Sequence, residues 1–322
     1  MDAFQQESVS AGKVWLIMSA FLIQMQGAVS QGILWGVMVL GVYITYKILD
    51  IADLTVDGSF ALGGCVCALF VVEKGYSPFV ASLLALLAGA LAGLVTGMLH
   101  TAFDIPAILA GILTQLGLWS INLRVMGKSN TPFLKVDTMI SQFSDLTGLS
   151  NGWAALIVGL AVAVVLILLL YWFFGTELGC AMRATGNNED MIRALGCNTK
   201  ITKIIALALS NGLVGLSGAL VAQQQKYADI GMGTGAIVIG LAAIVIGDVL
   251  MRKAISFWAK LISAVLGSVV YFVIRALVLR IGLDANDMKL FSAIFVALAL
   301  CIPVAASKWR VHKAYSEDGG NL

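Results

Sequence analysis

The chain has 322 residues, of which 60% are hydrophobic and 12% are charged. An average soluble domain is about 25% charged, so this composition excludes an ordinary water-soluble fold and indicates a protein that lies in lipid. The formal net charge of +2 is too small to indicate a nucleic-acid partner.

Apolar segments long enough to cross a membrane recur along the whole chain. A spanning helix needs about 20 mostly apolar residues, and by that length the sequence predicts about nine spans. We expect them at residues 27–48, 58–72, 78–99, 105–126, 153–175, 201–222, 236–250, 261–279 and 290–306. The runs 58–72 and 236–250 are short for a span. The apolar stretch 13–25 leaves three interpretations open: a tenth span, an interfacial helix or an extension of the first span.

The predicted fold is all-α, a polytopic bundle of about 9–10 transmembrane helices in two related halves with interrupted helices. Residues 1–26 form an N-terminal segment, either an extension or an extra span. One transmembrane domain covers 27–306, with halves at about 27–150 and 151–306. Glycines at helical spacing, in 89–97 and 212–218, predict close packing between helices.

Lysine and arginine gather in three connecting segments that strict alternation of the spans places on one side. These are residues 177–203, the turn after Leu250 and the tail 307–322. Because positively charged loops stay inside, we expect this side, including the tail, to be cytoplasmic.

Two polar segments interrupt the apolar pattern, each just before one of the short runs. The first carries Asp53, Thr55 and Asp57, and the second carries Asp229 and Thr234. An ionised aspartate at the centre of a bilayer costs about 2.5 to 3.5 kcal/mol, so these side chains should be buried against protein or a water-filled cavity. Paired interrupted helices are typical of transporters built from two repeats. The other interpretation is two polar loops at the surface.

We expect the interruptions to line a translocation path, together with an asparagine that shares a span with the second glycine cluster. The predicted path residues are Asp53, Thr55, Asp57, Gly58, Asn211, Asp229 and Thr234.

The connector 176–200 is the longest polar segment on the predicted cytoplasmic side. Asn187 or Asn188 is placed to cap a short helix, with an apolar stripe that includes Leu195 and with Gly196 at its end. Such a helix suits docking into a groove of a soluble partner; the alternative is a helix on the lipid surface. The predicted docking residues are Arg183, Ala184, Gly186, Asn187, Asn188, Glu189, Asp190, Leu195 and Gly196.

Motifs for chemistry on this chain are missing from the sequence. Residues 127–129 read Gly-Lys-Ser, like the end of a phosphate-binding loop, but Asn122 stands where that loop needs glycine. The five cysteines include no C-x-x-C pair, and no Ser-His-Asp or H-E-x-x-H set is present. We therefore expect no catalytic residue and no metal site here, and ATP, if it is used, to bind elsewhere.

The residues around both interruptions and the connector resemble a known transporter family. Residues 53–58, Asp-Leu-Thr-Val-Asp-Gly, are similar to a motif of the ribose and branched-chain amino-acid type permeases of ATP-binding-cassette importers. The pattern Gly179-x-x-x-Arg183-Ala184-x-Gly186-x-Asn188 resembles that family's coupling loop, and residues 229–247 resemble its second-half motif. Residues 48–60, 105–114 and 120–127 look like a subgroup proposed to import aromatic amino acids such as tryptophan.

The resemblance, which covers about residues 27–306, implies a type II importer fold and a permease that moves an amino acid by alternating access in the bacterial cytoplasmic membrane. Its implied partners are cytoplasmic ATP-binding subunits, which hold ATP and magnesium, an extracytoplasmic solute-binding protein, a second copy of the permease in a homodimer, and lipid. It implies no cofactor on this chain.

Two other functions remain open from the residues themselves. An ion-coupled secondary transporter would use Asp53 or Asp57 to carry a proton or sodium ion. An intramembrane enzyme is the least favoured because no catalytic set is visible.

Overall fold

The computed structural model describes residues 2–134, 136–252 and 256–280, and single positions between 290 and 301. Within these residues, seven helices are long and apolar enough to cross a membrane, and an eighth apolar helix, α10 (Ala236–Leu250), is shorter. These confirm the expected polytopic all-α fold. The predicted ninth span, 290–306, and the tail, 307–322, lie almost entirely outside the described residues.

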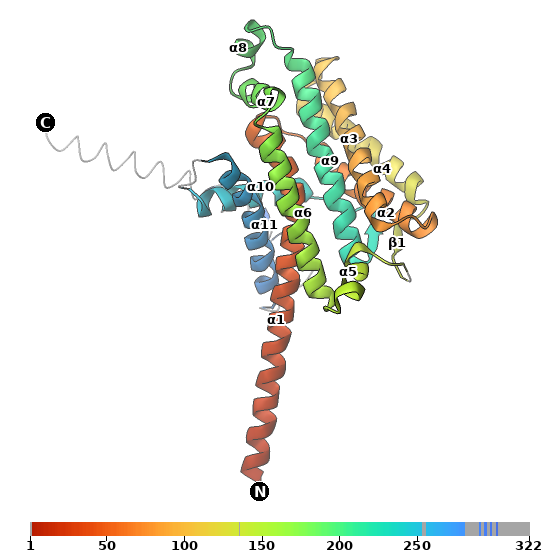
Figure 1. Cartoon of the computed structure of the whole chain (residues 1–322), viewed down its shortest axis with the longest axis vertical. Helices are drawn as coiled ribbons and strands as arrows, with labels where there is room; N and C mark the ends of the chain where they lie inside the picture. The colour runs from red at the N-terminus through yellow and green to blue at the C-terminus, as the bar shows by residue number, and fades with distance from the viewer. Residues whose placement is uncertain are drawn as a thin grey trace, which may run out of the picture.

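Helix α1 is the longest element and carries the first span. It runs unbroken over Asp2–Tyr43 and continues as the π-helical turn η1 over Ile44–Ile48. The stretch 13–25 is therefore part of the same helix as the first span, and the N-terminal part of α1 projects away from the other helices (Figure 1).

The remaining elements follow in chain order. The spanning helices are α2 (Thr55–Ala68) with its π-helical turn η2 (Leu69–Glu73), α3 (Pro78–Thr101), α4 (Ala107–Met126), α6 (Asn151–Phe173), α9 (Thr199–Gln225) and α11 (Phe257–Arg280). The connector forms α7 (Glu177–Asn187) and α8 (Glu189–Ala194) at one face. The opposite face carries α5 (Met139–Thr147), β1 (Asn130–Pro132) and β2 (Tyr227–Asp229) (Figure 1).

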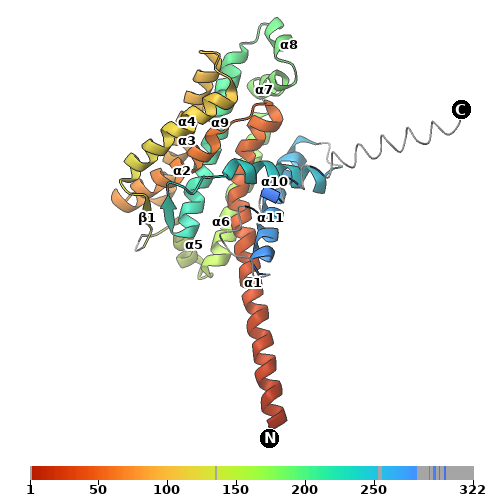
Figure 2. The same cartoon turned by 180° about the vertical axis from the view of Figure 1, so that it is seen from behind.

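Helix α9 is at the centre of the bundle. It packs against α3, α2 and α1, while α11 packs against α1 and α10 (Figure 2). The spanning windows of α1, α2 and α9 are mostly buried, whereas those of α4 and α6 are mostly exposed. Because no water-driven force separates helix contact from lipid contact inside a bilayer, the apolar outer surfaces of α4 and α6 are suited to lipid or to another membrane-embedded chain.

Two short strands, which the sequence did not predict, pair at the face opposite the connector. Strand β1 pairs antiparallel with β2, with Thr131 opposite Ala228. This pair ties the segment after α4 to the segment after α9.

Glycines bring the central helices into backbone contact. A Cβ at Gly63 of α2 would collide with the carbonyl of Gly215 of α9, and one at Gly89 of α3 would collide with the carbonyl of Asn211. The predicted role of the 89–97 and 212–218 glycines in helix packing is therefore confirmed for this α2–α3–α9 contact.

Replacing Gly63 with alanine should destabilise the bundle. The new methyl group meets a backbone carbonyl, and overpacking of this kind costs about 1 to 3 kcal/mol. Gly117→Ala of α4 is the matched control, because nothing lies within 4 Å of its added Cβ. We expect a lower apparent melting temperature for Gly63→Ala alone, measured by size-exclusion chromatography after heating. Equal melting temperatures for the two variants would contradict this packing.

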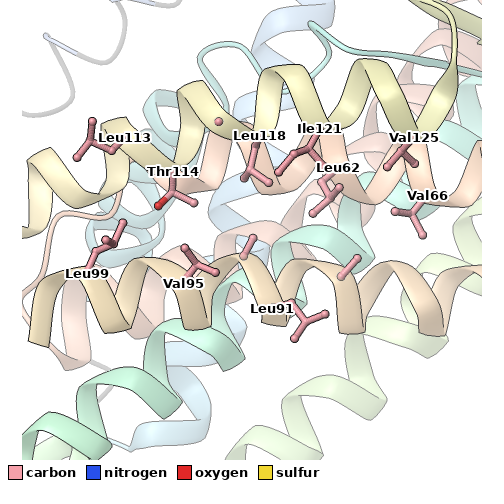
Figure 3. A pocket seen from close by; sticks show the side chains of 13 residues that line it. Leu62, Val66, Leu91, Val95, Leu99, Leu113, Thr114, Leu118, Ile121 and Val125 are labelled. Atoms are coloured by element: carbon pink, nitrogen blue, oxygen red, sulfur yellow. The ribbon is translucent and has the colours of Figure 1, made fainter. Parts of the chain in front are cut away.

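An apolar groove opens between α2, α3 and α4. Its volume is about 480 Å³, and its wall includes Leu62, Val95, Leu99 and Leu118 (Figure 3). The hydroxyl of Thr114 at this wall donates to the carbonyl of Ala110 in its own helix, at 3.0 Å. The groove therefore offers apolar surface and no charged group.

Candidate functional site

The first interruption of the helices is built around a buried aspartate. The chain turns at Asp50, whose φ of 57° is left-handed, and α2 begins at Thr55. Asp53 is only 2% exposed, and its Oδ1 accepts a hydrogen bond from the backbone N–H of Thr55 at 2.9 Å. This carboxylate therefore satisfies an amide at the start of α2 that has no partner inside the helix.

The same aspartate connects the break to α9. The side-chain amide of Asn211 donates to Asp53 Oδ2 at 2.6 Å, and the hydroxyls of Thr55 and Thr96 are 2.8 Å apart. Asp53, Thr55, Thr96 and Asn211 thus form one buried polar cluster between the start of α2, α3 and α9. A buried polar group with partners is stable inside a membrane.

The second interruption is held by Asp57. Its Oδ2 accepts from the backbone N–H of Gly235 at 2.8 Å, and its Oδ1 accepts from that of Ile237 at 2.9 Å. Gly235, with a left-handed φ of 83°, is the N-cap of α10. A carboxylate at a helix N-terminus neutralises unpaired amides and the positive end of the helix dipole. The start of α2 therefore binds directly to the start of α10.

The neighbouring predicted residues occupy three further environments. Gly58 packs against Leu118 and accepts a hydrogen bond at its carbonyl from Asn122, at 3.3 Å. Asp229 lies in the outer turn, where its Oδ1 accepts from the backbone N–H of Gly231 at 2.7 Å. Thr234 is exposed and lines a cavity beside α10. The structure brings Asp53, Thr55 and Asn211 together, while Asp229 lies apart from them.

The connector contains the expected short helix. Asn188 is its cap, with its Oδ1 accepting from the backbone N–H of Met191 at 2.9 Å. Gly196 has a left-handed φ of 87° just after the helix. Ile192 is buried, whereas Met191 and Leu195 are 52% and 71% exposed. The apolar stripe is thus divided between the inside of the protein and its surface.

Helix α7 is anchored on the ends of two spanning helices. Gly186 lies so close to the carbonyl of Ile48 that a Cβ would collide with it. The guanidinium of Arg183 lies over the ring of Phe257, at 4.9 Å from the centroid. The remaining predicted residues of this segment include Ala184, which is half-buried, and Asn187 and Asp190, which are exposed.

Glu189 fastens α8 to the start of α9. Its carboxylate pairs with Lys203 at 2.6 Å and with Arg193 at 2.9 Å, and accepts from the hydroxyl of Thr199 at 3.0 Å. Burial raises the pKa of this carboxyl, but the hydrogen bonds from Lys203 and Thr199 and the two positive charges outweigh that effect and lower the pKa below its usual value. The sequence predicted Glu189 as a docking residue, which stays a prediction, and gave no sign of this anchoring role.

Acid should loosen this anchor. A depressed pKa in the folded protein means that the pairing stabilises the connector above the unfolded-state pKa of about 4.3 and is lost as the pH falls through the folded value. We expect amides of α8 to lose hydrogen-exchange protection below about pH 4. Glu189→Gln should weaken protection at neutral pH already and remove this acid step, while Asp190→Asn should retain both. An unchanged acid step in Glu189→Gln would refute the assignment.

Comparisons with known proteins agree with this architecture. Residues 24–302 match the family described as branched-chain amino acid transport system, permease component. A tyrosine transport system permease protein of Clostridioides difficile is 42% identical over 277 residues, covering 84% of this chain and 90% of the relative. An uncharacterized protein of Rickettsia prowazekii is 33% identical, over 85% of this chain and 95% of its own length.

More distant relatives are also permeases. The autoinducer 2 import system permease protein LsrC of Escherichia coli is 31% identical over 64% of this chain and 58% of its own length. No solved structure gives a significant match. The family match over nearly the whole chain, with the seven spanning helices, shows that this chain belongs to the permease-component family of branched-chain amino acid transport systems and is a multi-pass bacterial inner-membrane protein.

Proposed function

We propose that this chain is the membrane-spanning subunit of an ATP-driven importer that moves an amino acid, most specifically one with an aromatic side chain. Family membership supports the transporter class, and the likeness to a tyrosine transport permease supports the substrate class. ATP and magnesium are bound by separate cytoplasmic subunits, and the functional unit includes a second copy of this chain and an extracytoplasmic solute-binding protein.

The observation that carries the proposal is the connector of α7 and α8. It presents exposed apolar side chains on a rigid, salt-bridged support at the face where lysine and arginine gather. A short helix with an exposed apolar edge suits a groove on a soluble partner. The lipid-surface alternative has less support, because Arg193 is the only basic residue on α8 and it pairs with Glu189.

A displacement of the connector can be transmitted into the bundle through a continuous series of contacts. Lys203, at the start of α9, is paired with Glu189, and Asn211 further along α9 holds Asp53 before α2. Asp57, about one helical turn after Asp53, accepts a hydrogen bond from the start of α10. Closure of the ATP-binding subunits would thus shift α9, α2 and α10 together, which is the relation that alternating access requires between motor and path.

The test is association with a motor. The chain, tagged and extracted in mild detergent, should co-purify with ATP-binding subunits encoded in neighbouring reading frames. Adding the solute-binding protein with its solute should stimulate ATP hydrolysis by this complex. A chain that retains no such subunit from its own cells would count against the proposal and would favour the ion-coupled transporter.

A further inference from the structure

A second cavity, with mixed polar and aromatic walls, lies beside the interrupted helix α10. Its volume is about 570 Å³, and it is lined by α1, the end of α9, the segment from β2 to α10, α11 and Ala293. Small-molecule sites usually measure about 300 to 1,000 Å³, so the space is sufficient for a free amino acid. Its side chains include Gln31, Trp35, Tyr227, Thr234 and Arg275.

Arg275 is the charged group of this cavity. It is half-buried within α11, and none of the ion pairs between described residues includes it. Its guanidinium contacts the ring of Phe272, at 5.7 Å from the centroid. Arg275 and Gln31 also line an adjoining cavity of about 240 Å³, which reaches Leu279 near the outer end of α11. An arginine inside a span is costly, and its planar donors match a carboxylate.

Trp35 supplies the aromatic wall and a donor without an acceptor. Its side chain is 6% exposed and packs on Phe60 and Phe272, with ring centroids 4.6 and 5.3 Å away. Its indole N–H is buried and has no hydrogen-bond partner among the described residues. Buried donors in proteins almost always have a partner, and none of the described residues supplies one to this donor.

The other candidate spaces lack this combination. A cavity of about 510 Å³ beside the connector has Arg183 and aromatic walls, but none of its described lining residues carries a buried donor without a partner. The groove between α2, α3 and α4 carries no charged group (Figure 3). In the cluster around Asp53, both carboxylate oxygens already accept hydrogen bonds from the chain itself. The cavity at Arg275 combines a cation with the aromatic wall of Trp35, whose buried indole N–H has no partner among the described residues.

We propose that this cavity is the subsite where the permease holds the transported amino acid, with Arg275 paired to the carboxylate and Trp35 forming part of the wall for an apolar side chain. This inference rests on the proposed function for its substrate class. A charge-assisted guanidinium–carboxylate pair is among the strongest polar contacts available in a protein. Gly235 and Thr234, in the wall of the cavity, lie at the start of α10, and Asp57 accepts a hydrogen bond from Gly235. Movement of α10 would therefore change the shape of the subsite.

The experiment measures binding to the purified full chain in lipid nanodiscs, without the solute-binding protein. The probes are L-phenylalanine and L-phenylalaninamide, which share a side chain but differ in the carboxylate. We expect saturable binding of the acid by the unmodified chain, and binding of the amide at least about tenfold weaker, as loss of a charge-assisted pair requires. Arg275→Gln should remove the preference for the acid, and Arg275→Lys should retain part of it.

Arg124→Gln provides the matched control, because Arg124 is an exposed arginine of α4 and does not line the cavity. It should keep the full preference. Equal binding of acid and amide by the unmodified chain, no saturable binding of the acid, or an unchanged preference in Arg275→Gln would each overturn the subsite. Retention of ATP-binding subunits is measured on the same preparation. Loss of amino-acid binding and loss of these subunits are therefore separate results.

Discussion

Replacing Leu195 with aspartate is expected to abolish retention of the ATP-binding subunits while the chain still folds and inserts. Leu195 is 71% exposed at the end of α8 and makes little contact with the rest of the chain. Full burial of a leucine side chain contributes about 1.5 to 3 kcal/mol, and a charge buried in its place without a partner costs more. We therefore expect the apparent dissociation constant for the ATP-binding subunit to rise at least about 100-fold.

The matched control for this experiment is Leu146→Asp. Leu146 is 85% exposed on α5, at the face opposite the connector, and its replacement should leave subunit retention unchanged. The two variants are compared by affinity purification from equal amounts of membrane. If Leu195→Asp retains the subunits as well as the control does, α8 does not dock through its exposed apolar edge.

Replacing Asp57 with alanine should have the second large effect, on stability and on transport together. Two amides at the start of α10 would lose their acceptor. Hydrogen bonds to a charged group contribute about 1.5 to 3 kcal/mol each, and replacement partners are scarce inside a membrane. We expect a clearly lower apparent melting temperature and loss of ATP-driven uptake. Asp57→Asn keeps one acceptor oxygen. Its apparent melting temperature and its uptake should lie between those of Asp57→Ala and those of the unmodified chain.

Asp145→Ala is the control for these variants, since Asp145 is an exposed aspartate on α5. Its melting temperature should match that of the unmodified chain. A melting temperature for Asp57→Ala equal to that of this control would mean that the contact between α2 and α10 does not stabilise the bundle.

Local patterns in the sequence predicted the spans and the connector helix well. Span length and apolar composition depend only on neighbouring residues, and so do the capping of α8 by Asn188 and its ending near Gly196. Aspartates next to short apolar runs also marked both interruptions in the sequence. An ionised carboxylate inside a span must be paired, whatever its partner is.

The partners themselves could not be predicted from local patterns. Asp57 binds amides that lie 178 and 180 residues further along the chain, and Glu189 binds Lys203, 14 residues away. Hydrophobic periodicity carries no information on such contacts. Arg275 belongs to no motif in the sequence, and only the fold shows that it shares a cavity with Trp35.

The ion-coupled alternative assigned a proton or sodium ion to Asp53 or Asp57. Each carboxylate already accepts two hydrogen bonds from the chain, from Thr55 and Asn211 in one case and from Gly235 and Ile237 in the other. Through these contacts, both aspartates link the interrupted helices to other parts of the bundle.

We propose that a separate ATP-hydrolysing subunit, docked on α7 and α8, drives transport through this chain. The most direct measurement is uptake of labelled L-tyrosine into proteoliposomes that contain the permease with its co-purified subunits, with the solute-binding protein added outside. An impermeant maleimide that labels the exposed Cys197 identifies the membrane face on which the connector lies. We predict uptake only when ATP is present on that face. Uptake by this chain alone, driven by a sodium or proton gradient without ATP, would show that no ATP-hydrolysing subunit is needed.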